Sequence, residues 1–463
     1  MSTLHDLQRA TGGTINWPAG VTRATEEITL GPISIDSRQA EPGCVFWGLK
    51  GSCYDGDDFA DDALAHGALG AVVAKPIEAP AERWVLRVDD TLEALQQWAA
   101  WKRQHFTGTV IAVTGSVGKT TTRQMIHTVL QTRFSGTASP RNYNNHLGVP
   151  LSMAQLDAGH DYAVLELGAS RQGEIAALAE LCIPKVGVIT HVGDAHLGGF
   201  GSREAIAAAK AELLTALPPD GHAILGDDPW LRRMARRSAA TITWVGCAAG
   251  CDVQATDVCC EGGEMRFRVA GCQFSVPVWG RHHLISALAT VAVGRIMGFD
   301  YEQIAAALKQ FQSVPMRCQV IEIRGATIIN DTYNASPTAM QAALELVRDF
   351  DAPGRRIIVC GDMAELGGEA PLLHQQLGRQ IVKLCGADLL IACGQHARDV
   401  VAGARAAGMP RDRAIPCRTP EETLPYLGQA ILPGDVVLVK GARVLAMDRV
   451  VEAMAQYPKR RTG

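Results

Sequence analysis

A glycine-rich loop between a predicted strand and a predicted helix is the stretch of this sequence best suited to chemistry. Residues 110–113, Val-Ile-Ala-Val, form a short apolar run typical of a buried parallel strand, and residues 115–120 follow it as Gly-Ser-Val-Gly-Lys-Thr. Residues 121–130 predict a helix. Glycines let backbone N–H groups approach a phosphate, the helix N-terminus adds partial positive charge, and the lysine adds a full charge. The sequence therefore predicts a phosphate-binding loop, with the Thr120 hydroxyl placed to ligate Mg²⁺.

The loop is a shortened form of the common nucleotide-binding motif. The full motif would have glycine at position 113, where this chain has Val113, so the pattern is Thr-Gly-x-x-Gly-Lys-Thr. The alternative is a chance Gly-Lys-Thr in a surface turn, but the strand before the loop and the helix after it favour a nucleotide site. We expect the nucleotide to contact Gly115, Ser116, Val117, Gly118, Lys119, Thr120 and Thr121.

An acidic residue at the end of the next long strand supplies the second half of such a site. Residues 162–166, Tyr-Ala-Val-Leu-Glu, predict a strand that ends at Glu166. A carboxylate at the end of an apolar strand beside a phosphate loop commonly holds the magnesium of a nucleoside triphosphate, although aspartate is commoner there. We therefore expect Glu166 to face the loop.

A histidine and a lysine further along the chain have two interpretations each. A loop containing His196 follows the predicted strand 185–190 and leads to a predicted helix over 205–217, with Lys210 near its middle. From spacing alone, a lysine in an alanine-rich helix is a solvated side chain. From spacing alone, His196 is a capping or core histidine rather than a ligand.

The elements that must position these side chains indicate an α/β protein of three domains. The chain has 463 residues, and ~150 residues is a common domain size. Residues 1–83 predict a small α/β domain, and 84–313 a central P-loop-type ATPase domain with a parallel sheet. In 314–463 strands alternate with helices again, which implies a doubly wound, Rossmann-like domain. Its predicted strands are 327–331, 356–360, 388–393 and 435–439, and its predicted helices are 338–350, 372–384 and 396–407.

Polar residues at strand ends mark two further candidate regions. Asp36, Ser37, Arg38 and Lys50 lie at strand ends of the first domain, where ligands of α/β domains commonly bind. Surface polar residues and a helix cap are the alternative there. The third domain also has polar strand ends, so we expect it to present groups to a cleft against the central domain. These strand ends are 330–334, 361–367 and 440–441.

Composition narrows the class of protein. A hydrophobic fraction of 47% is ordinary for a folded globular protein, and a net charge of -4 provides no global basic field that would attract nucleic acid. Thirteen cysteines without a CxxC pair indicate reduced thiols in a cytoplasm. No apolar run reaches ~18 residues, and the first residues lack the apolar core of a signal peptide. We expect a cytoplasmic protein that neither spans a membrane nor binds nucleic acid.

Several segments spread along the chain match the pattern of a known family. The most specific are Tyr-Asn-Ala-Ser-Pro at 333–337 and Gly-Asp-Met-Ala-Glu-Leu-Gly at 361–367. The others are 36–38, 114–121, 166–168, 196–202, 209–212, 330–332 and 438–441. In these segments the chain resembles the ATP-dependent Mur ligases of bacterial peptidoglycan synthesis. It is most similar to the branch that adds D-Ala-D-Ala, because the Asp-Asn-Pro-Arg motif of the diaminopimelate-adding branch does not occur.

The resemblance implies an acid–amino-acid ligase that uses ATP and Mg²⁺. ATP would phosphorylate the C-terminal carboxylate of UDP-N-acetylmuramoyl-tripeptide. The amine of D-Ala-D-Ala would then attack the acyl phosphate, and ADP and phosphate would be released. Phosphoryl transfer depends mostly on positioning and charge neutralisation. These small-molecule substrates are the implied partners, and we expect a monomer.

The resemblance also implies roles for individual residues. Lys119 and the loop amides would hold the phosphates, and Thr120 with Glu166 would hold one Mg²⁺. Glu166, His196 and a carbamylated Lys210 would surround a second Mg²⁺, so the implied catalytic set is Lys119, Glu166, His196 and Lys210. The implied further nucleotide contacts are His282, Arg317, Asp331 and Asn334, and the implied substrate contacts are Asp36, Ser37, Arg38, Lys50, Asn144 and Asn145.

Three positions depart from the family pattern. His283 stands where the family usually has asparagine after histidine, Ala442 replaces a serine after Lys-Gly, and Gly198 replaces an acidic residue. These departures affect nucleotide and substrate contacts and leave the implied catalytic set unchanged.

Two other classes of protein are alternatives to this interpretation. A folylpolyglutamate synthetase shares the ligase chemistry, but it begins with the phosphate-loop domain, whereas this chain has a domain before it. A GTP-binding switch needs an Asn-Lys-x-Asp segment to read guanine, and this chain contains no Asn-Lys pair. The sequence leaves open whether the tripeptide ends in diaminopimelate or lysine.

Overall fold

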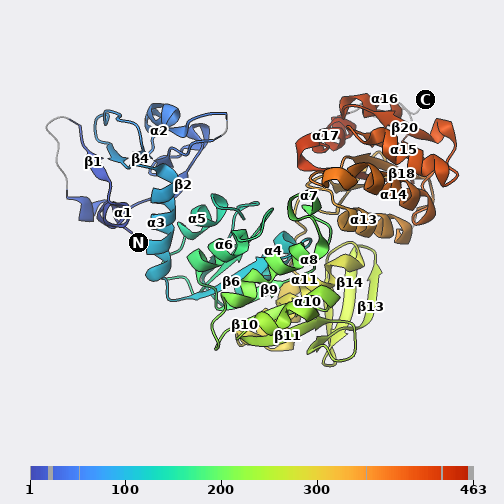
Figure 1. The fold of residues 1–463 in the computed structure, drawn as a ribbon, viewed down its shortest axis with the longest axis horizontal. Helices are drawn as coiled ribbons and strands as arrows, with labels where there is room; N and C mark the ends of the chain where they lie inside the picture. Colours follow the sequence, from blue (N-terminus) through green and yellow to red (C-terminus); the bar gives the residue numbers. More distant parts are fainter. Residues whose placement is uncertain (1, 19–23, 52, 351, 429–430, 457–463) are drawn as a thin grey trace.

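The computed structural model describes residues 2–18, 24–51, 53–350, 352–428 and 431–456, and it confirms an α/β fold built around separate sheets. Figure 1 shows the chain as a first unit in blue, a central unit in green and yellow, and a C-terminal unit in red. The C-terminal unit lies against the central unit, and helix α3 connects the first unit to the central unit. No described helix is long and apolar enough to cross a membrane.

The first unit is a mixed sheet with the strand order β1-β5-β4-β3-β2. Its last strand, β5, lies beyond the boundary expected at residue 83, so the first sheet extends past that boundary. β5 was missed because the strand is short and follows a polar loop. The strands are β1 Thr14–Asn16, β2 Ile33–Ser34, β3 Val45–Trp47, β4 Gly70–Val73 and β5 Trp84–Arg87, and the helices are α1 Leu4–Thr11, α2 Ala60–Ala65 and α3 Thr91–Gln104.

The central unit is a parallel sheet with the order β12-β11-β10-β9-β6-β8-β7. Its middle strands are apolar throughout because helices cover both faces. One face packs against α4, α11 and an antiparallel ribbon, β13–β15, and the other against α6, α8 and α9. The strands are β6 Thr109–Thr114, β7 Gly136–Ala138, β8 Tyr162–Glu166, β9 Val186–Ile189, β10 His222–Gly226, β11 Thr241–Gly246, β12 Val253–Gln254, β13 Thr256–Glu261, β14 Glu264–Val269 and β15 Cys272–Val276.

One predicted helix of the central unit is in fact two. The expected helix over 205–217 breaks at Ala211, and Lys210 is therefore the last residue of α8 rather than the middle of a longer helix. Next to the break, the Glu212 carboxylate accepts hydrogen bonds from the Gly173 and Ala176 amides at the beginning of α6. The helices of this unit are α4 Lys119–Leu130, α5 Gly148–Met153, α6 Glu174–Cys182, α7 Leu197–Phe200, α8 Arg203–Lys210, α9 Glu212–Thr215, α10 Pro229–Met234, α11 Leu284–Ile296 and α12 Tyr301–Leu308.

The C-terminal unit is a doubly wound sheet with the order β16-β17-β21-β18-β19-β20. All its pairings are parallel except that of the edge strand β16 with β17. Two apolar clusters lie on opposite faces, one with α13–α15 and one with α16 and α17. The elements are β16 Gln319–Ile323, β17 Ala326–Asp331, β18 Arg356–Gly361, β19 Leu389–Cys393, β20 Ala414–Cys417, β21 Val436–Lys440, α13 Pro337–Asp349, α14 Ala370–Lys383, α15 Ala397–Ala406, α16 Leu424–Gly428 and α17 Asp448–Gln456.

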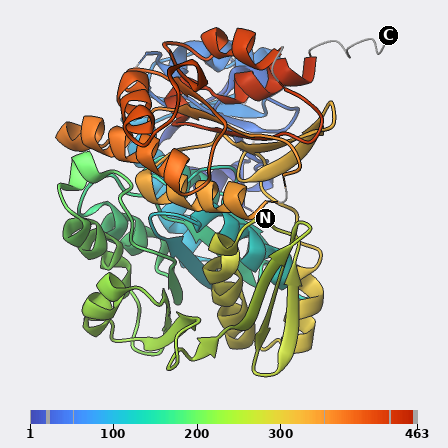
Figure 2. The same ribbon diagram turned by 90° about the vertical axis from the view of Figure 1, so that its right-hand side faces the viewer.

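The turned view in Figure 2 shows how the units stack around the middle of the molecule. The C-terminal unit lies above the central sheet, and α13 faces that sheet from the upper unit. The carboxyl ends of parallel strands are where α/β sheets bind ligands. The candidate site therefore lies where the carboxyl ends of β6, β8 and β9 meet the C-terminal unit.

Candidate active site

The phosphate loop has the backbone conformation that its glycines predict. Gly115 (φ 145°) and Gly118 (φ 82°) both have left-handed φ values, and Lys119 is the first residue of α4. A Cβ on Gly115 would lie 2.0 Å from the Thr190 hydroxyl oxygen, so only glycine fits there. The Lys119 ammonium donates to the Gly115 carbonyl at 2.9 Å, and burial lowers its pKa. The loop thus presents backbone amides and a lysine at a helix N-terminus, which is an anion-binding arrangement.

Thr120, Glu166 and Asn144 form an oxygen-rich corner beside this loop. The Thr120 hydroxyl donates to Glu166 Oε2 at 2.7 Å, and the Asn144 amide donates to Glu166 Oε1 at 2.8 Å. The Glu166 side chain is buried at the end of β8, next to β6 in the sheet. A hydroxyl and a carboxylate at this spacing are the hard donors that Mg²⁺ prefers, so the residues present fit that ion.

A buried arginine completes the corner, and sequence reasoning missed it. Arg123 lies one turn into α4, and its Nη1 donates to the Ser139 and Arg141 carbonyls while lying 3.8 Å from Glu166 Oε2. It therefore fixes the 139–141 segment that precedes Asn144. The available signal was its position three residues after Thr120, on the same face of the helix.

The C-terminal unit reaches the same corner through Arg317. Its guanidinium donates to the Thr120 hydroxyl at 2.8 Å and stacks on the Tyr333 ring, with its carbon 3.9 Å from the ring centroid. The structure thus brings Arg317 to the phosphate loop, as expected for a nucleotide or phosphate contact from the third domain. The tyrosine beneath it was part of a recognised segment but had been given no role.

Asp331 and Asn334 lie near Arg317, and both are held by protein groups. The Asp331 carboxylate forms a buried ion pair with Lys440 and accepts from the Cys318 amide at 3.1 Å. Lys440 also donates to the Asn334 carbonyl at 2.9 Å, and the Asn334 side chain accepts from the next amide at 2.8 Å. A ribose hydroxyl at Asp331 would therefore meet a carboxylate already fixed in place by Lys440, which sequence reasoning left without a role.

His196 and Lys210 have partners other than Glu166. The His196 imidazole pairs with the Glu365 carboxylate of the C-terminal unit. The Lys210 side chain is 2% exposed, its ammonium lies 5.8 Å from the Phe200 ring centroid, and none of the ion pairs among the described residues includes it. Burial, followed by the charge of Lys119, lowers the pKa of Lys210 to about 7. The structure therefore places Lys210 close enough to Lys119 to feel its charge, but it does not bring His196, Lys210 and Glu166 into direct contact.

The residues of the first unit that we expect to contact the substrate interact with residues close to them in the sequence. The Asp36 carboxylate caps a short turn by accepting from the Arg38 amide and guanidinium, and the hydrogen bond from Arg38 lowers its pKa. Ser37 is buried, and Lys50 forms a backbone bridge with Asp55. In the central unit, Asn145 caps the turn before α5 by accepting from the Leu147 and Gly148 amides, whereas its neighbour Asn144 reaches Glu166. The helix-cap alternative thus describes Asp36 in this structure.

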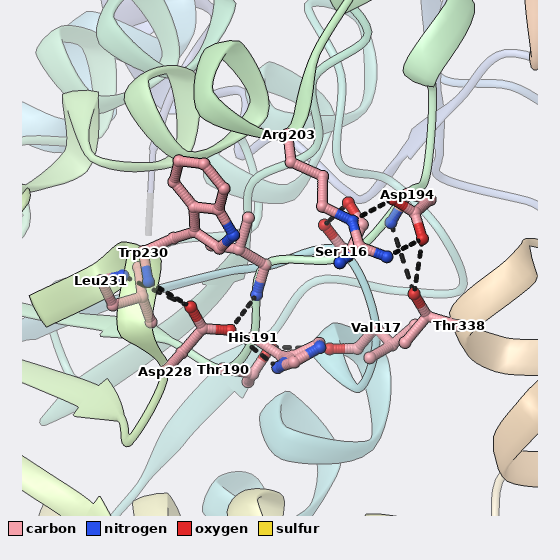
Figure 3. A network of polar contacts seen from close by, with 12 residues as sticks. Ser116, Val117, Thr190, His191, Asp194, Arg203, Asp228, Trp230, Leu231 and Thr338 are labelled. Carbon is pink, nitrogen blue, oxygen red and sulfur yellow. Dashed lines mark hydrogen bonds and ion pairs between the residues drawn. The ribbon is translucent and has the colours of Figure 1, made fainter. Parts of the chain in front are cut away.

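Figure 3 shows a second polar network on the other side of the loop, which the sequence did not predict. The His191 ring lies 3.0 Å from Asp228, and the Arg203 guanidinium pairs with Asp194. The Thr338 hydroxyl of α13, in the C-terminal unit, accepts from the Asp194 amide at 3.3 Å and donates to the Asp194 carboxylate at 3.5 Å. The side chains of His191, Arg203, Asp228 and Thr338 line a cavity of about 430 Å³ between the two units. Its remaining lining residues are Val192, Pro229, Trp230, Gln341, Ala342 and Glu345.

Gly198, one of the departures from the family pattern, is a point of close contact between the two units. Its amide donates to the Glu365 carbonyl at 2.8 Å. A Cβ on Gly198 would lie 2.7 Å from the Gly367 nitrogen and 2.9 Å from the Glu365 oxygen, and both of these are backbone atoms. The missing side chain therefore lets α7 approach the 365–367 segment.

The fold and the corner define an ATP-dependent ligase of known family. Three family models match in succession: Mur ligase family, catalytic domain over 30–103; Mur ligase middle domain over 113–294; and Mur ligase, glutamate ligase domain over 316–443. The chain belongs to the Mur ligase family.

The chain is similar to ligases and crystal structures from one branch of that family. The UDP-N-acetylmuramoyl-tripeptide–D-alanyl-D-alanine ligases of Bacillus subtilis and Escherichia coli are each 34% identical, with 94% and 93% of this chain and 95% of each relative covered. The crystal structure of MurF from Acinetobacter baumannii superposes with a TM-score of 0.83 at 32% identity over 98% of both chains. MurF from Thermotoga maritima, crystallised with ADP, has a TM-score of 0.77 at 30% identity, covering 92% of this chain and 97% of that one.

Proposed function

We propose that this protein is the ATP-dependent ligase that joins D-Ala-D-Ala to UDP-N-acetylmuramoyl-tripeptide. The observation that carries the proposal is the contact between Thr120 and Glu166 beside Lys119 of the phosphate loop, which Arg317 reaches from the C-terminal unit. Relatives that carry this activity in their names cover nearly the whole chain, which supports the particular substrates.

The chain's own groups would serve the first half of the reaction. The tripeptide carboxylate attacks the γ-phosphorus of ATP, and the bond to the β-phosphate oxygen breaks, so that an acyl phosphate and ADP form. Lys119 and the loop amides hold the β- and γ-phosphates, and Arg317 places a second positive charge at the same point. Thr120 and Glu166 would hold Mg²⁺, which would supply neutralisation of the phosphate charge.

The second half of the reaction needs an acceptor held in place and water kept out. The amine of D-Ala-D-Ala attacks the acyl carbon, the bond to the phosphate oxygen breaks, and the amine loses a proton. We propose that His196 and a carbamylated Lys210 would hold a second Mg²⁺ with Glu166. A carbamate is a hard oxygen donor, as Mg²⁺ prefers, whereas an ammonium at Lys210 would repel the ion.

We also propose a division of labour among the three units. The first, which includes β5, would take the UDP end of the substrate near Asp36, Ser37, Arg38 and Lys50. The central unit would bind ATP, and the C-terminal unit would supply Arg317, Asp331, Asn334 and His282 to the nucleotide side of the cleft. We propose that the chain acts on small molecules as a cytoplasmic monomer. Light scattering at working concentration gives the molecular mass in solution and so tests the monomer.

The experiment follows phosphate release from purified protein with ATP, Mg²⁺, D-Ala-D-Ala and each UDP-tripeptide. We expect release only when both peptide substrates are present, and the product should be the UDP-pentapeptide. The tripeptide that supports faster turnover decides between diaminopimelate and lysine at its third position. Equal turnover with free D-alanine, or with a dipeptide of L-residues, would overturn the assignment.

A further inference from the structure

Three metal-ligating side chains meet where the central unit joins the C-terminal unit. His282 and His283 lie in the turn at Arg281–His283 before α11, and Cys318 lies at the beginning of the C-terminal unit, before β16. The His282 Nε2 atom is 3.6 Å from Cys318 Sγ, and the ligand atoms of all three residues lie within 4.8 Å of one another. Two imidazoles and a thiolate are a common donor set for Zn²⁺.

The spacing of these atoms is close to that of a tetrahedral site. Bonds of about 2.0–2.1 Å to nitrogen and about 2.3 Å to sulfur place the two ligand atoms roughly 3.5 Å apart. His282 and Cys318 already have this separation. The ligand atom of His283 lies within 4.8 Å of the other two, so bringing it to bonding distance requires a movement of at most about 1.3 Å.

The surroundings provide an entrance and a carboxylate beside the three ligands. His282 is exposed, whereas His283 and Cys318 are buried, so the cluster is open on one side only. The Asp331 carboxylate lies beside Cys318, whose amide it accepts at 3.1 Å. Charges on every side are balanced, because Asp331 and Glu345 are negative and Arg317 and Lys440 are positive. Binding a dication releases the thiol proton, so the bound ion adds a single net charge.

His283 adds a second imidazole to the cluster. Imidazole nitrogen and thiolate sulfur both suit borderline divalent cations such as Zn²⁺. We propose that His282, His283 and Cys318 form a binding site for a borderline divalent cation such as Zn²⁺, which ties the C-terminal unit to the central unit. The metal site lies beside Arg317 and Asp331, so a bound ion hinders nucleotide binding. The effect on nucleotide binding rests on the proposed function, whereas the metal site itself does not.

Cobalt titration of the full chain tests the site directly. Co²⁺ is added to reduced protein without nucleotide, and the thiolate-to-cobalt charge-transfer band and the visible bands of a tetrahedral ion are recorded. We expect both bands to saturate near one ion per chain and Zn²⁺ to remove them. In Cys318→Ser the charge-transfer band should vanish, and in His283→Asn the affinity should fall by at least the roughly 10–100-fold that loss of an outer-shell group costs.

Matched controls separate this site from the other thiols. Cys260 is exposed in the β13–β14 hairpin, so Cys260→Ser should keep the wild-type titration. His282→Gln changes an exposed side chain, leaves the buried members in place and should weaken binding as His283→Asn does. A wild-type protein without the charge-transfer band, or a band that Cys318→Ser and Cys260→Ser share, would overturn the proposal.

Nucleotide binding provides the second readout. With a fluorescent ATP analogue, micromolar Zn²⁺ should raise the apparent Kd of the wild type and have little effect on that of His283→Asn. Equal sensitivity of the two proteins to Zn²⁺ would show that the ion acts elsewhere. Because the cobalt bands are recorded without nucleotide, they report the site even if the ligase activity is not the one proposed.

Discussion

At the scale of single residues, Lys210 is the side chain whose surroundings are least compatible with its ordinary charge. It is 2% exposed at the end of α8, and burial lowers its pKa to about 7, with Lys119 as the next cause. A neutral amine reacts with dissolved CO₂ to give an anionic carbamate. The same position thus changes from a group that repels a cation to an oxygen donor for one.

We predict that Lys210→Ala loses nearly all ligation and that acetate restores part of it. The small carboxylate would fill the space of the missing carbamate, while nucleotide still binds through Lys119. Lys210→Arg should show no rescue because its charge remains. Labelled bicarbonate offers a readout apart from activity, since a ¹³C carbamate signal should appear in the wild type and not in Lys210→Arg. Wild-type turnover in Lys210→Ala without added carboxylate would contradict this prediction.

The sequence predicted single residues where a local motif fixes both type and backbone. Lys119, Thr120 and Glu166 needed only a loop and two strand ends, and Thr120 and Glu166 are in contact in the structure. Partners supplied by distant segments were not predictable. Arg123 donates to the 139–141 carbonyls, and Glu365 pairs with His196 from another unit, so sequence spacing does not show which groups these residues contact.

At the scale of elements, the turn between β18 and α14 depends on a neutral histidine. His374 is fully buried; its Nε2 accepts from the Met363 amide at 2.9 Å, and its Nδ1–H donates to the Ala370 carbonyl at 2.7 Å. A ring that accepts at one nitrogen and donates at the other is uncharged. Burial lowers the pKa of His374 below its usual 6.5.

We predict that acid destabilises the fold through His374. Below about pH 6.5 the unfolded chain binds a proton that the folded chain refuses, so the free energy of unfolding falls by up to about 1.4 kcal/mol per pH unit until the folded pKa is reached. His374→Gln removes this titration, and the loss of Tm between pH 7 and pH 5 should be smaller than in the wild type. The exposed His66 is the control, because His66→Gln should keep the wild-type pH dependence. Identical pH dependences for wild type and His374→Gln in calorimetry would contradict the prediction.

Elements were predictable where their hydrophobic pattern is long and regular. The strand Tyr162–Glu166 has the predicted bounds, and the alternation after residue 326 correctly gave a doubly wound sheet. Short strands such as β5 and β7 carry too few residues for a pattern. The break at Ala211 leaves no mark in the hydrophobic pattern, and the Glu212 carboxylate next to it bonds to the amides at the beginning of α6, a tertiary contact that helix propensity does not predict.

At the scale of the whole molecule, the phosphate loop and Arg317 belong to different units, so the site is complete only when those units are together. Arg317 contacts Thr120, and Gly198 contacts the 365–367 segment, on two sides of the same interface. Closure of such an interface excludes water, which would hydrolyse an acyl phosphate.

We predict that the molecule becomes more compact when it binds an ATP analogue together with the UDP-tripeptide. Gly198→Ala places a Cβ against backbone atoms and should reduce this compaction. Gly368→Ala is the matched control, because a Cβ there meets nothing within 4 Å. Small-angle X-ray scattering gives the radius of gyration of each protein with and without ligands. A wild-type radius that stays constant with both ligands saturating would contradict the prediction.

The Gly198 contact also has a consequence for inheritance. A glycine codon that mutates to another amino acid always adds at least one carbon, and any added carbon at position 198 meets the backbone of Glu365 or Gly367. A missense change at this codon can therefore loosen this interface but cannot preserve it. In a mutational scan scored by cell growth, codon 198 should lose its missense variants, whereas codon 368, a glycine with open space around it, should keep them.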